Sequence, residues 1–290
     1  MTNGISGINH IGKMHSSEIS PTNSKFAVTG GYGFLAEKLV KRLVEQNNEV
    51  VVICRNPRKA NDLYGDNENV EVVVGDLIEK GTHVSLLKHR MDGIYHLAAS
   101  RDILHCEKNA IEAVKSNIIS TLNVLDLSVR RDSKFVVGAS TFAADKPTGV
   151  YGSSKLITEK LFSQFQEINS DAQYGVLRFG PLLYSPGSVL CLWKDALRDN
   201  KKIILTNPSA TRKFVTADSV VDELLKRPKG TVEFKTKSIK MGDLLTAFLD
   251  KYSDNPDLVE KEVSGLREGE QLESGEVEEL MTVEEIKKII

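Results

Sequence analysis

Short runs of apolar, often β-branched residues alternate with amphipathic segments from Lys25 to Arg178. The first runs cover residues 26–28 and 50–53, and the segment from Leu35 to Gln46 between them has the spacing of a helix. Later strands are expected at residues 70–74, 93–98, 135–137 and 175–177, and later helices at 109–129 and 152–165. Strands that are almost entirely apolar and alternate with helices predict a parallel sheet covered on both faces. The pattern therefore predicts a doubly wound α/β fold of the Rossmann type.

This rhythm ends after Arg178, where a loop rich in Gly and Pro is followed by an expected helix at 189–198 and a short strand at 203–205. Such a segment suits a small lobe above the carboxyl edge of the sheet, where open α/β sheets bind their ligands. We expect a flexible arm over residues 1–24 and a dinucleotide-binding domain over 25–178. Residues 179–290 would form mainly a substrate-binding lobe, with some elements returning to the first domain. The acidic tail from Glu273 is predicted to be a solvated helix.

Composition narrows the classes of function. The chain has 290 residues, 40% hydrophobic content and a net charge of -2. The stretch 252–290 holds 12 acids and 4 bases, so the rest carries +6, which suits a small phosphorylated ligand better than nucleic acid. No apolar run approaches the roughly 20 residues of a membrane span, and the start lacks a signal peptide, so we expect a cytoplasmic protein without membrane insertion. Cys54, Cys106 and Cys191 lack metal-type spacing, and neither a disulfide framework nor a metal site is expected.

A glycine-rich turn joins the first expected strand to the first expected helix. Gly30, Gly33 and Ala36 form a G-x-x-G-x-x-A pattern, in which glycines permit a tight turn and close approach of a pyrophosphate to a helix N-terminus. The alternative is a glycine-rich turn without a ligand. The residues expected to contact the dinucleotide here are Gly30, Gly31, Tyr32, Gly33, Phe34 and Leu35.

The end of the second strand carries bases where NAD-preferring sites carry an acid. Arg55, with Arg58 or Lys59 nearby, would neutralise a 2'-phosphate, which favours NADP over NAD. The alternative is a surface turn with solvated bases. After the third strand, Asp76 and Leu77 are expected to meet the adenine, although a lone Gly-Asp could equally be a strand-ending turn.

Candidate catalytic residues follow the strand at 135–137. Ser140 and Thr141 come at its carboxyl end, Tyr151 lies eleven residues after Ser140, and Lys155 lies one helical turn further on. A phenol with a pKa near 10 is a poor base, but the lysine charge and an oxidised nicotinamide would lower that pKa. Tyr151 could then take the proton of a sugar hydroxyl while Lys155 holds the nicotinamide ribose. The alternative is an ordinary amphipathic helix with an exposed Tyr and Lys.

These motifs resemble the extended short-chain dehydrogenase/reductase family, and within it the branch of UDP-N-acetylglucosamine 4,6-dehydratases. The resemblance spans roughly residues 25–280. The matching segments are Thr29–Ala36, Gly75-Asp76, His96–Ala99, Glu107–Asn109 with Asn117-Ile118, Ser140-Thr141, Tyr151–Lys155, Arg178–Gly180, Ser185–Val189, Thr211-Arg212 and Gly265–Glu270. The family further implies cofactor contacts from Ala98, Ala99 and Phe179, a UDP-linked amino sugar as substrate, and assembly into a homo-oligomer. Its pattern places Arg101, Glu107 and Asn109 near the sugar, and Arg212, Arg267 and Glu270 near the diphosphate or uridine.

The chain departs from that branch at one informative place. The dehydratases carry an Asp-Lys pair directly after the Ser-Thr, and the pair protonates the leaving hydroxyl and removes the proton at carbon 5. Here the two positions are Phe142 and Ala143, which cannot move a proton, while Asp145 and Lys146 follow slightly later. We therefore expect oxidation at carbon 4 followed by a variant second half: elimination with a relocated base, 4-epimerisation or ketosugar reduction. A non-catalytic NADP-binding partner or sensor is the alternative of a different class.

Overall fold

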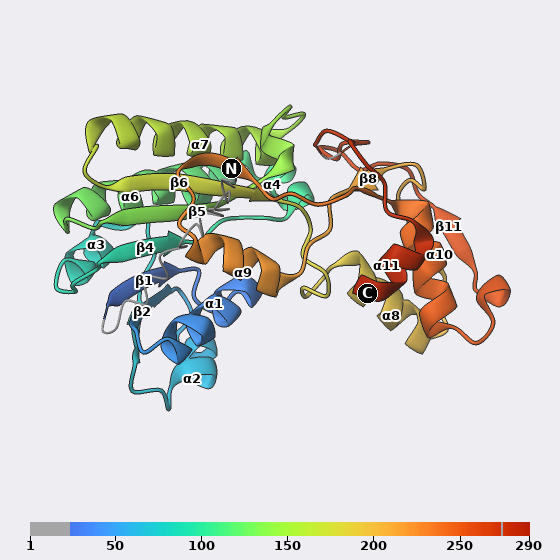
Figure 1. The fold of residues 1–290 in the computed structure, drawn as a ribbon, viewed down its shortest axis with the longest axis horizontal. Coiled ribbons are helices and arrows are strands. Elements are labelled where there is room, and N and C mark those ends of the chain that lie inside the picture. Colours follow the sequence, from blue (N-terminus) through green and yellow to red (C-terminus); the bar gives the residue numbers. More distant parts are fainter. Residues whose placement is uncertain (1–23, 274) are drawn as a thin grey trace, which may run out of the picture.

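The structure, a computed structural model, describes residues 24–273 and 275–290. Its larger part is built on a seven-stranded sheet of order β3-β2-β1-β4-β5-β6-β9, in which every neighbouring pair is parallel (Figure 1). The strands are β1 (Lys25–Thr29), β2 (Glu49–Cys54), β3 (Val70–Val74), β4 (Gly93–His96), β5 (Phe135–Thr141), β6 (Gln173–Phe179) and β9 (Gly230–Glu233). The predicted doubly wound α/β fold is confirmed. The strand order reverses between β1 and β4, and ligands of open α/β sheets bind at such a point.

Helices cover both faces of the sheet. Successive residues of a strand point to opposite faces, and here the residues on both faces are apolar. Phe26 and Val28 pack with α1 (Phe34–Glu45), α2 (Pro57–Tyr64) and α9 (Ala217–Leu225). Ala27 points the other way and packs in the layer of α3 (Lys80–Leu86), α6 (Ser120–Arg130) and α7 (Val150–Ile168), and Figure 1 shows the two layers on opposite sides of the strands. The sheet is thus buried on both sides, which explains its apolar strands.

The helix predicted over 109–129 is present but not regular. It runs as α5 (Ala110–Ala113), a π-helical segment η1 (Val114–Ile119) and α6, and it is preceded by α4 (Ile103–Lys108). In the π-helical segment, backbone amides bond carbonyls five residues earlier instead of four, so the turn is wider than in an α-helix. The carbonyl of Asn117 accepts bonds from the hydroxyls of Thr121 (2.6 Å) and Thr158 (3.1 Å), which ties this helix to α7.

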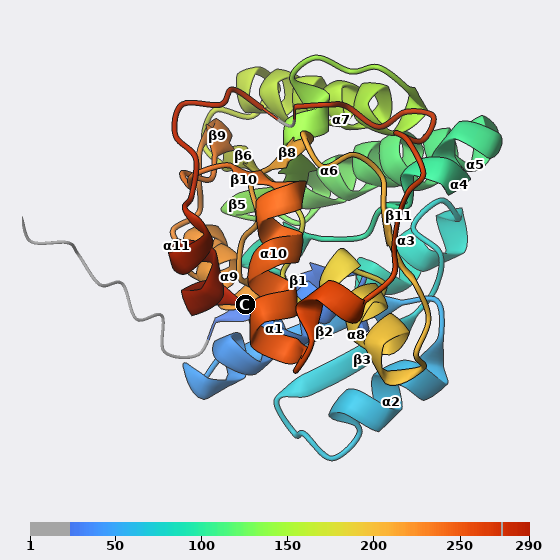
Figure 2. The same cartoon turned by 90° about the vertical axis from the view of Figure 1, so that its right-hand side faces the viewer.

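A smaller lobe with its own core lies beyond the carboxyl edge of the sheet (Figure 1). Trp193 and Phe248 lie at its centre, with ring centroids 5.4 Å apart, and Figure 2 shows its helices gathered in front of the sheet. Its elements are α8 (Val189–Arg198), β7 (Ile203–Leu205), β8 (Thr211–Arg212), β10 (Ile239–Lys240), α10 (Met241–Tyr252), η3 (Pro256–Leu258), β11 (Lys261–Val263) and α11 (Val283–Ile289).

The acidic tail differs from the predicted solvated helix. Among the tail residues that the structure describes, only α11 is helical, and it begins with a capping box in which Thr282 and Glu285 bond reciprocally. Ile286 is fully buried and Ile290 nearly so in the lobe core. The prediction was wrong in two respects: residues 275–282 are not helical, and one face of α11 is apolar and packs into the lobe core.

The chain crosses between lobe and sheet more than once. Val215 pairs with Leu182, α9 packs on α1, and β9 adds the last strand beside β6. At this junction a Cβ on Gly180 would lie 1.9 Å from the carbonyl oxygen of Lys213, so the two backbones are in direct contact. The segment that leads into β9 is therefore fixed against the carboxyl end of β6.

Within the described ranges, no helix has the length and apolar character needed to cross a membrane. Nor do those residues contain a group of three or more His, Cys, Asp or Glu side chains that could hold a metal ion.

Candidate active site

The glycine loop between β1 and α1 requires glycine for steric reasons. Gly30 has φ +68°, and a Cβ there would lie 2.9 Å from the amide nitrogen of Ala98. A Cβ on Gly31 would lie 2.0 Å from Cγ1 of Val52. Gly33 is exposed and begins α1 without any side-chain cap, so the first amides of that helix are free to bind an anion. The loop has the form of a pyrophosphate cradle.

Buried hydrogen bonds hold this loop in place. The Tyr64 hydroxyl donates to the carbonyl of Gly31 at 2.6 Å. Thr29 Oγ1 accepts from the amides of Leu97 (3.1 Å) and Ala98 (3.0 Å) and bonds His96 Nδ1 at 2.8 Å. Because burial lowers the pKa of His96 to about 3, its ring is neutral, and Nε2 donates to Thr121 at 2.9 Å. The ends of β1 and β4 are thereby locked together.

The other predicted cofactor residues surround the same edge. Arg55 and Asp76, from the ends of β2 and β3, approach to 3.9 Å, and the Arg55 side chain is 66% exposed. The Tyr32 ring lies 5.6 Å below Lys59 Nζ, and Leu35 and Leu77 are buried. Phe34 and Phe179 are partly buried against the sheet core, as is Ala98 on the opposite face, while Ala99 follows Ala98 and is half-buried.

Tyr151, Thr141 and Lys155 meet at the carboxyl end of β5. Tyr151 is hydrogen-bonded to Thr141, and Lys155 Nζ donates to the carbonyl of Ala139 at 2.9 Å. Burial raises the pKa of Tyr151, whereas the bond from Thr141 and the charge of Arg101 lower it. Burial lowers the pKa of Lys155 to about 8, opposed by the charge of Glu159. The phenol thus has a hydroxyl partner, Thr141, and one cation, Arg101, that favour its ionised form, as proton transfer requires.

Ser140 points to the opposite side of the strand from Thr141. Its hydroxyl donates to Glu159 Oε1 at 2.5 Å, and Arg178 binds both carboxylate oxygens of Glu159 at 2.7 Å. Ser140 therefore belongs to a buried ion pair under α7, and the hydroxyl next to Tyr151 is that of Thr141. From the sequence alone, either hydroxyl could have been the one next to Tyr151.

The relocated acid and base considered from the sequence do not converge on Tyr151. The carboxylate of Asp145 binds Arg178 at 3.2 Å, on the side of Glu159, and Arg178 also binds Glu233 at 3.0 Å. The carbonyl of Lys146 accepts a bond from Gln271, and the Lys146 residue is exposed. Phe142, in the single turn η2 (Phe142–Ala144), is 1% exposed.

The structure divides the predicted sugar-facing residues into two groups. Arg101 and Glu107 lie beside Tyr151: Arg101 lowers its pKa, and Glu107 accepts from the amides of Val150 (3.0 Å) and Tyr151 (3.2 Å). Glu107 thus caps the start of α7, where a carboxylate is stabilised by the helix dipole. Asn109 is exposed and bonds the carbonyl of His105 at 3.0 Å.

The predicted diphosphate residues lie on the lobe side. Arg212 bonds the carbonyls of Thr211 (2.8 Å) and Leu272 (3.3 Å), and burial lowers its pKa while the charge of Glu270 raises it. The Arg267 amide donates to Glu270 at 3.1 Å within an exposed turn. Arg212 is therefore held in place by protein contacts, whereas Arg267 stands at the surface.

Two buried charged residues were not anticipated from the sequence. Glu159 could have been found, because it lies one helical turn after Lys155 on the same buried face of α7. Lys213 is buried next to Phe142, and no local pattern around it indicates that contact.

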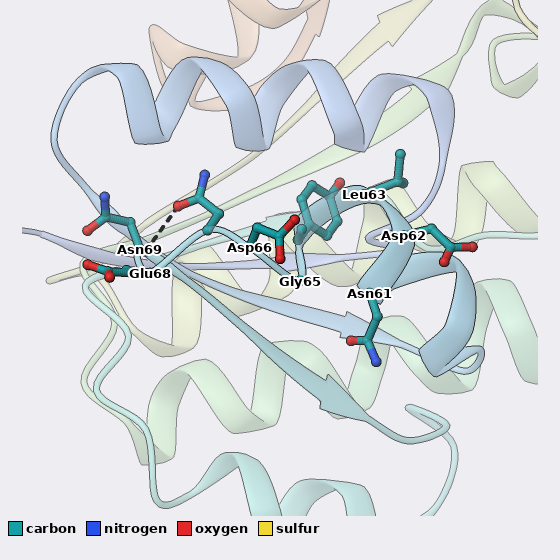
Figure 3. A pocket seen from close by; sticks show the side chains of 9 residues that line it. Asn61, Asp62, Leu63, Gly65, Asp66, Glu68 and Asn69 are labelled. Carbon is teal, nitrogen blue, oxygen red and sulfur yellow. Dashed lines mark hydrogen bonds between the residues drawn. The ribbon is translucent and has the colours of Figure 1, made fainter.

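A prominent hollow in the surface is not this site. It measures about 480 Å³, and Figure 3 shows it lined by residues 61–69, which form the end of α2 and the turn that leads to β3. This turn precedes β3 and so lies at the amino edge of the sheet, opposite the edge that carries Tyr151. The candidate site is defined by its converging side chains and not by hollow volume.

Fold and site together define a member of the extended short-chain dehydrogenase/reductase class. The chain belongs to the polysaccharide biosynthesis protein family, whose model matches residues 26–289. The family resemblance predicted from the sequence is thereby confirmed.

Individual relatives agree with this assignment. An uncharacterized membrane protein of Methanocaldococcus jannaschii is 30% identical over 273 residues, which cover 89% of this chain and 80% of that protein. A UDP-N-acetylglucosamine 4,6-dehydratase (inverting) of Campylobacter jejuni is 28% identical, with 84% and 75% covered. The solved structure of Pen from Bacillus thuringiensis superimposes with a TM-score of 0.79 at 27% identity and covers 87% of this chain and 81% of that one.

Proposed function

We propose that this chain is a nicotinamide-dependent enzyme that oxidises a UDP-linked sugar at carbon 4 and returns the hydride to the same carbon, as a 4-epimerase does. The observation that carries the proposal is the Thr141–Tyr151–Lys155 arrangement, combined with Phe142 and Ala143 where an elimination would need an acid and a base. The chain's family and the dehydratase of Campylobacter jejuni support the choice of a nucleotide sugar.

The cofactor assignment rests on the fit of the glycine loop. The loop admits no side chain at Gly30 or Gly31, and the uncapped start of α1 at Gly33 suits a pyrophosphate. When bound, a nicotinamide accepts a hydride from carbon and gives it back. NADP is the preferred form in this proposal, because Arg55 is largely exposed at the end of β2 and available to a 2'-phosphate.

The protein's part in the chemistry is proton transfer and positioning. Tyr151 would remove the proton of the sugar's 4-hydroxyl and return it after the hydride has come back, so that no external acid or base is consumed. Thr141 would orient the same oxygen, and the charges of Lys155 and Arg101 would stabilise the phenolate form. Glu107 would keep the first turn of α7, and hence Tyr151, in position.

A 4,6-dehydratase is the second candidate, favoured by the Campylobacter jejuni relative. Elimination needs one group to remove the proton at carbon 5 and one to protonate the leaving hydroxyl. Asp145, the acid nearest in sequence, is held by Arg178. The geometry therefore favours epimerisation over elimination.

One incubation separates the candidates. The protein is mixed with UDP-N-acetylglucosamine and NADP or NAD, and the products are analysed by mass spectrometry and NMR. A 4-epimer of unchanged mass supports the proposal, whereas loss of water would identify a dehydratase. Absence of any reaction at carbon 4, with binding of the cofactor intact, would favour the non-catalytic alternative.

Assembly into a homo-oligomer is part of the proposal. Apolar side chains are exposed along the outer surface of α5, η1, α6 and α7, a surface suited to a second copy. They are Ile111, Val114, Ile119, Leu122, Val129, Ile157 and Ile168. Light scattering after size-exclusion chromatography should give a dimer or larger, and Leu122→Glu together with Ile157→Glu should shift it towards the monomer.

A further inference from the structure

Tyr64, the last residue of α2, has a buried side chain that reaches the glycine loop. The residue is 6% exposed and packs in the same core as α1. Its hydroxyl donates to the carbonyl oxygen of Gly31 at 2.6 Å. Burial raises the pKa of Tyr64, so the hydroxyl stays protonated and remains a donor at physiological pH. The glycine loop is thus bonded to α2 by a donor that does not titrate there.

This bond acts at a place where the chain alone leaves the backbone free. Gly31 donates its amide to the carbonyl of Ile53 at 3.2 Å, and a Cβ on Gly31 would lie 2.0 Å from Cγ1 of Val52. Glycine is therefore required at position 31, and a glycine permits more backbone orientations than any other residue. Without a bond to its carbonyl, the peptide that joins Gly31 to Tyr32 could rotate. The Tyr64 hydroxyl selects one orientation of that peptide.

The orientation of the peptide decides what the Tyr32 amide faces. No peptide bond among the described residues is cis, and in a planar trans peptide the N–H points opposite to the C=O. Because the Gly31 carbonyl points to Tyr64 in the core, the Tyr32 N–H points away from the core. Within the described part of the chain, this amide donates to no acceptor. It is followed by the exposed Gly33, so it lies on the open side of the loop beside the uncapped start of α1.

We propose that Tyr64 is a positioning residue for the dinucleotide: its hydroxyl holds the Gly31–Tyr32 peptide so that the Tyr32 amide donates to the pyrophosphate. This inference rests on the proposed function, which puts the pyrophosphate in the glycine loop. Tyr64 touches neither the cofactor nor the reacting atoms, because its hydroxyl lies on the core side of Gly31. An amide that already faces an anion needs no rearrangement when the anion binds, which strengthens binding.

The test compares a ligand that has the pyrophosphate with one that lacks it. NADPH carries the pyrophosphate, whereas adenosine 2'-monophosphate keeps only the adenine, its ribose and the 2'-phosphate. Dissociation constants are measured by calorimetry for the wild type and for Tyr64→Phe, which keeps the buried ring and removes the hydroxyl. For a wild type that prefers NADH, the two ligands are NADH and adenosine.

Tyr64→Phe should weaken NADPH binding about 5- to 20-fold, because one hydrogen bond to a charged group is no longer aligned. Binding of adenosine 2'-monophosphate should change by less than about twofold. At saturating cofactor, the turnover number for the sugar should stay within about twofold of the wild type. The cofactor concentration that gives half the maximal rate should rise in proportion to the dissociation constant.

Tyr174→Phe is the matched control. Tyr174 is also buried, and its hydroxyl bonds Ser128 at 3.0 Å and Asn169 at 3.1 Å, but it packs in the core on the opposite face of the sheet. This variant loses a buried hydroxyl that is remote from the glycine loop. Its melting temperature should fall, whereas both ligands should bind as they do to the wild type.

Three results would overturn the inference. They are equal NADPH affinity in the wild type and Tyr64→Phe, an equal loss of affinity for adenosine 2'-monophosphate, and an equal loss of NADPH affinity in Tyr174→Phe. Turnover at carbon 4 by the wild type is scored separately. Turnover by the wild type with unchanged dinucleotide affinity in Tyr64→Phe rejects the role of Tyr64 and retains the proposed function. A wild type that binds no dinucleotide rejects both.

Discussion

Two buried lysines lie near the end of β5, and their surroundings differ in kind. Lys155 is 7% exposed and donates to the Ala139 carbonyl, with the charge of Glu159 nearby. Lys213 is 8% exposed and meets only the face of Phe142 among the described residues. The two residues are thus similarly buried but differently bonded: the Lys155 ammonium has a carbonyl acceptor, whereas the Lys213 ammonium lies over an aromatic ring.

The largest expected effect comes from breaking the Lys155 region at its reactive group. Tyr151→Phe removes the proton-transfer hydroxyl, and turnover at carbon 4 should fall by about 10²- to 10⁴-fold. Binding of the cofactor should persist, because the glycine loop and Lys155 are unchanged. Initial rates by NMR and dinucleotide titration by fluorescence check both parts. Tyr184→Phe, which removes a hydroxyl bonded to Tyr252 in the lobe, serves as the control, and equal rates in the two variants would refute the role of Tyr151.

The next prediction tests whether the ion pairs of Arg178 stabilise the fold. Arg178→Met leaves the carboxylate of Glu159, 4% exposed, without its bidentate partner. Loss of one member of a buried ion pair typically costs about 3–5 kcal/mol of unfolding free energy, which urea titration would measure. Arg198→Met removes an arginine from exposed pairs with Asp195 and Asp199 and should cause no measurable change. A similarly small effect at Arg178 would show that the pair is dispensable.

A smaller, pH-dependent effect is expected from His96. Burial lowers its pKa from 6.5 to about 3. Between these two pH values, His96 is therefore protonated in the unfolded chain and neutral in the folded chain. Stability should therefore decrease as the pH falls from about 6.5, by up to about 1.4 kcal/mol per pH unit from this one group. The free energy of unfolding, measured at several pH values, should depend less steeply on pH in His96→Gln than in the wild type. An identical dependence in both proteins would assign the acid sensitivity elsewhere.

The smallest effect concerns Arg55, an exposed cation whose expected partner is a ligand. Arg55→Ala should weaken NADPH binding by about tenfold and leave NADH binding nearly unchanged, since only NADPH carries the 2'-phosphate. Titrations of both dinucleotides with the wild type and the variant measure this. Tighter binding of NADH than NADPH by the wild type would reverse the cofactor preference. Arg90→Ala, which removes an exposed arginine paired with Asp92, provides the matched comparison.

Local patterns in the sequence were enough to predict the sheet and to place several candidate residues at its carboxyl edge. Strands such as Val70–Val74 were predicted to the residue because apolar runs between turns are local signals. Tyr151 and Lys155 were predicted because one helical turn separates them, and the glycine loop because its spacing is itself the motif.

Features that depend on distant contacts were beyond that reasoning. The tail was misjudged because the partner of Ile286 is the lobe core, formed by segments remote in the chain. The contact of Lys213 with Phe142 joins residues 71 positions apart, and the sequence around neither residue indicates it. Choosing Thr141 over Ser140 required knowing which face of β5 lies under α7.

The contact between Gly180 and the Lys213 carbonyl has a mechanical consequence. Because there is no room for even a methyl group at position 180, the segment that carries Lys213 is held against the end of β6, and the lobe cannot shift there without breaking this contact. Any motion of the outer lobe helices must therefore take place in segments away from this contact.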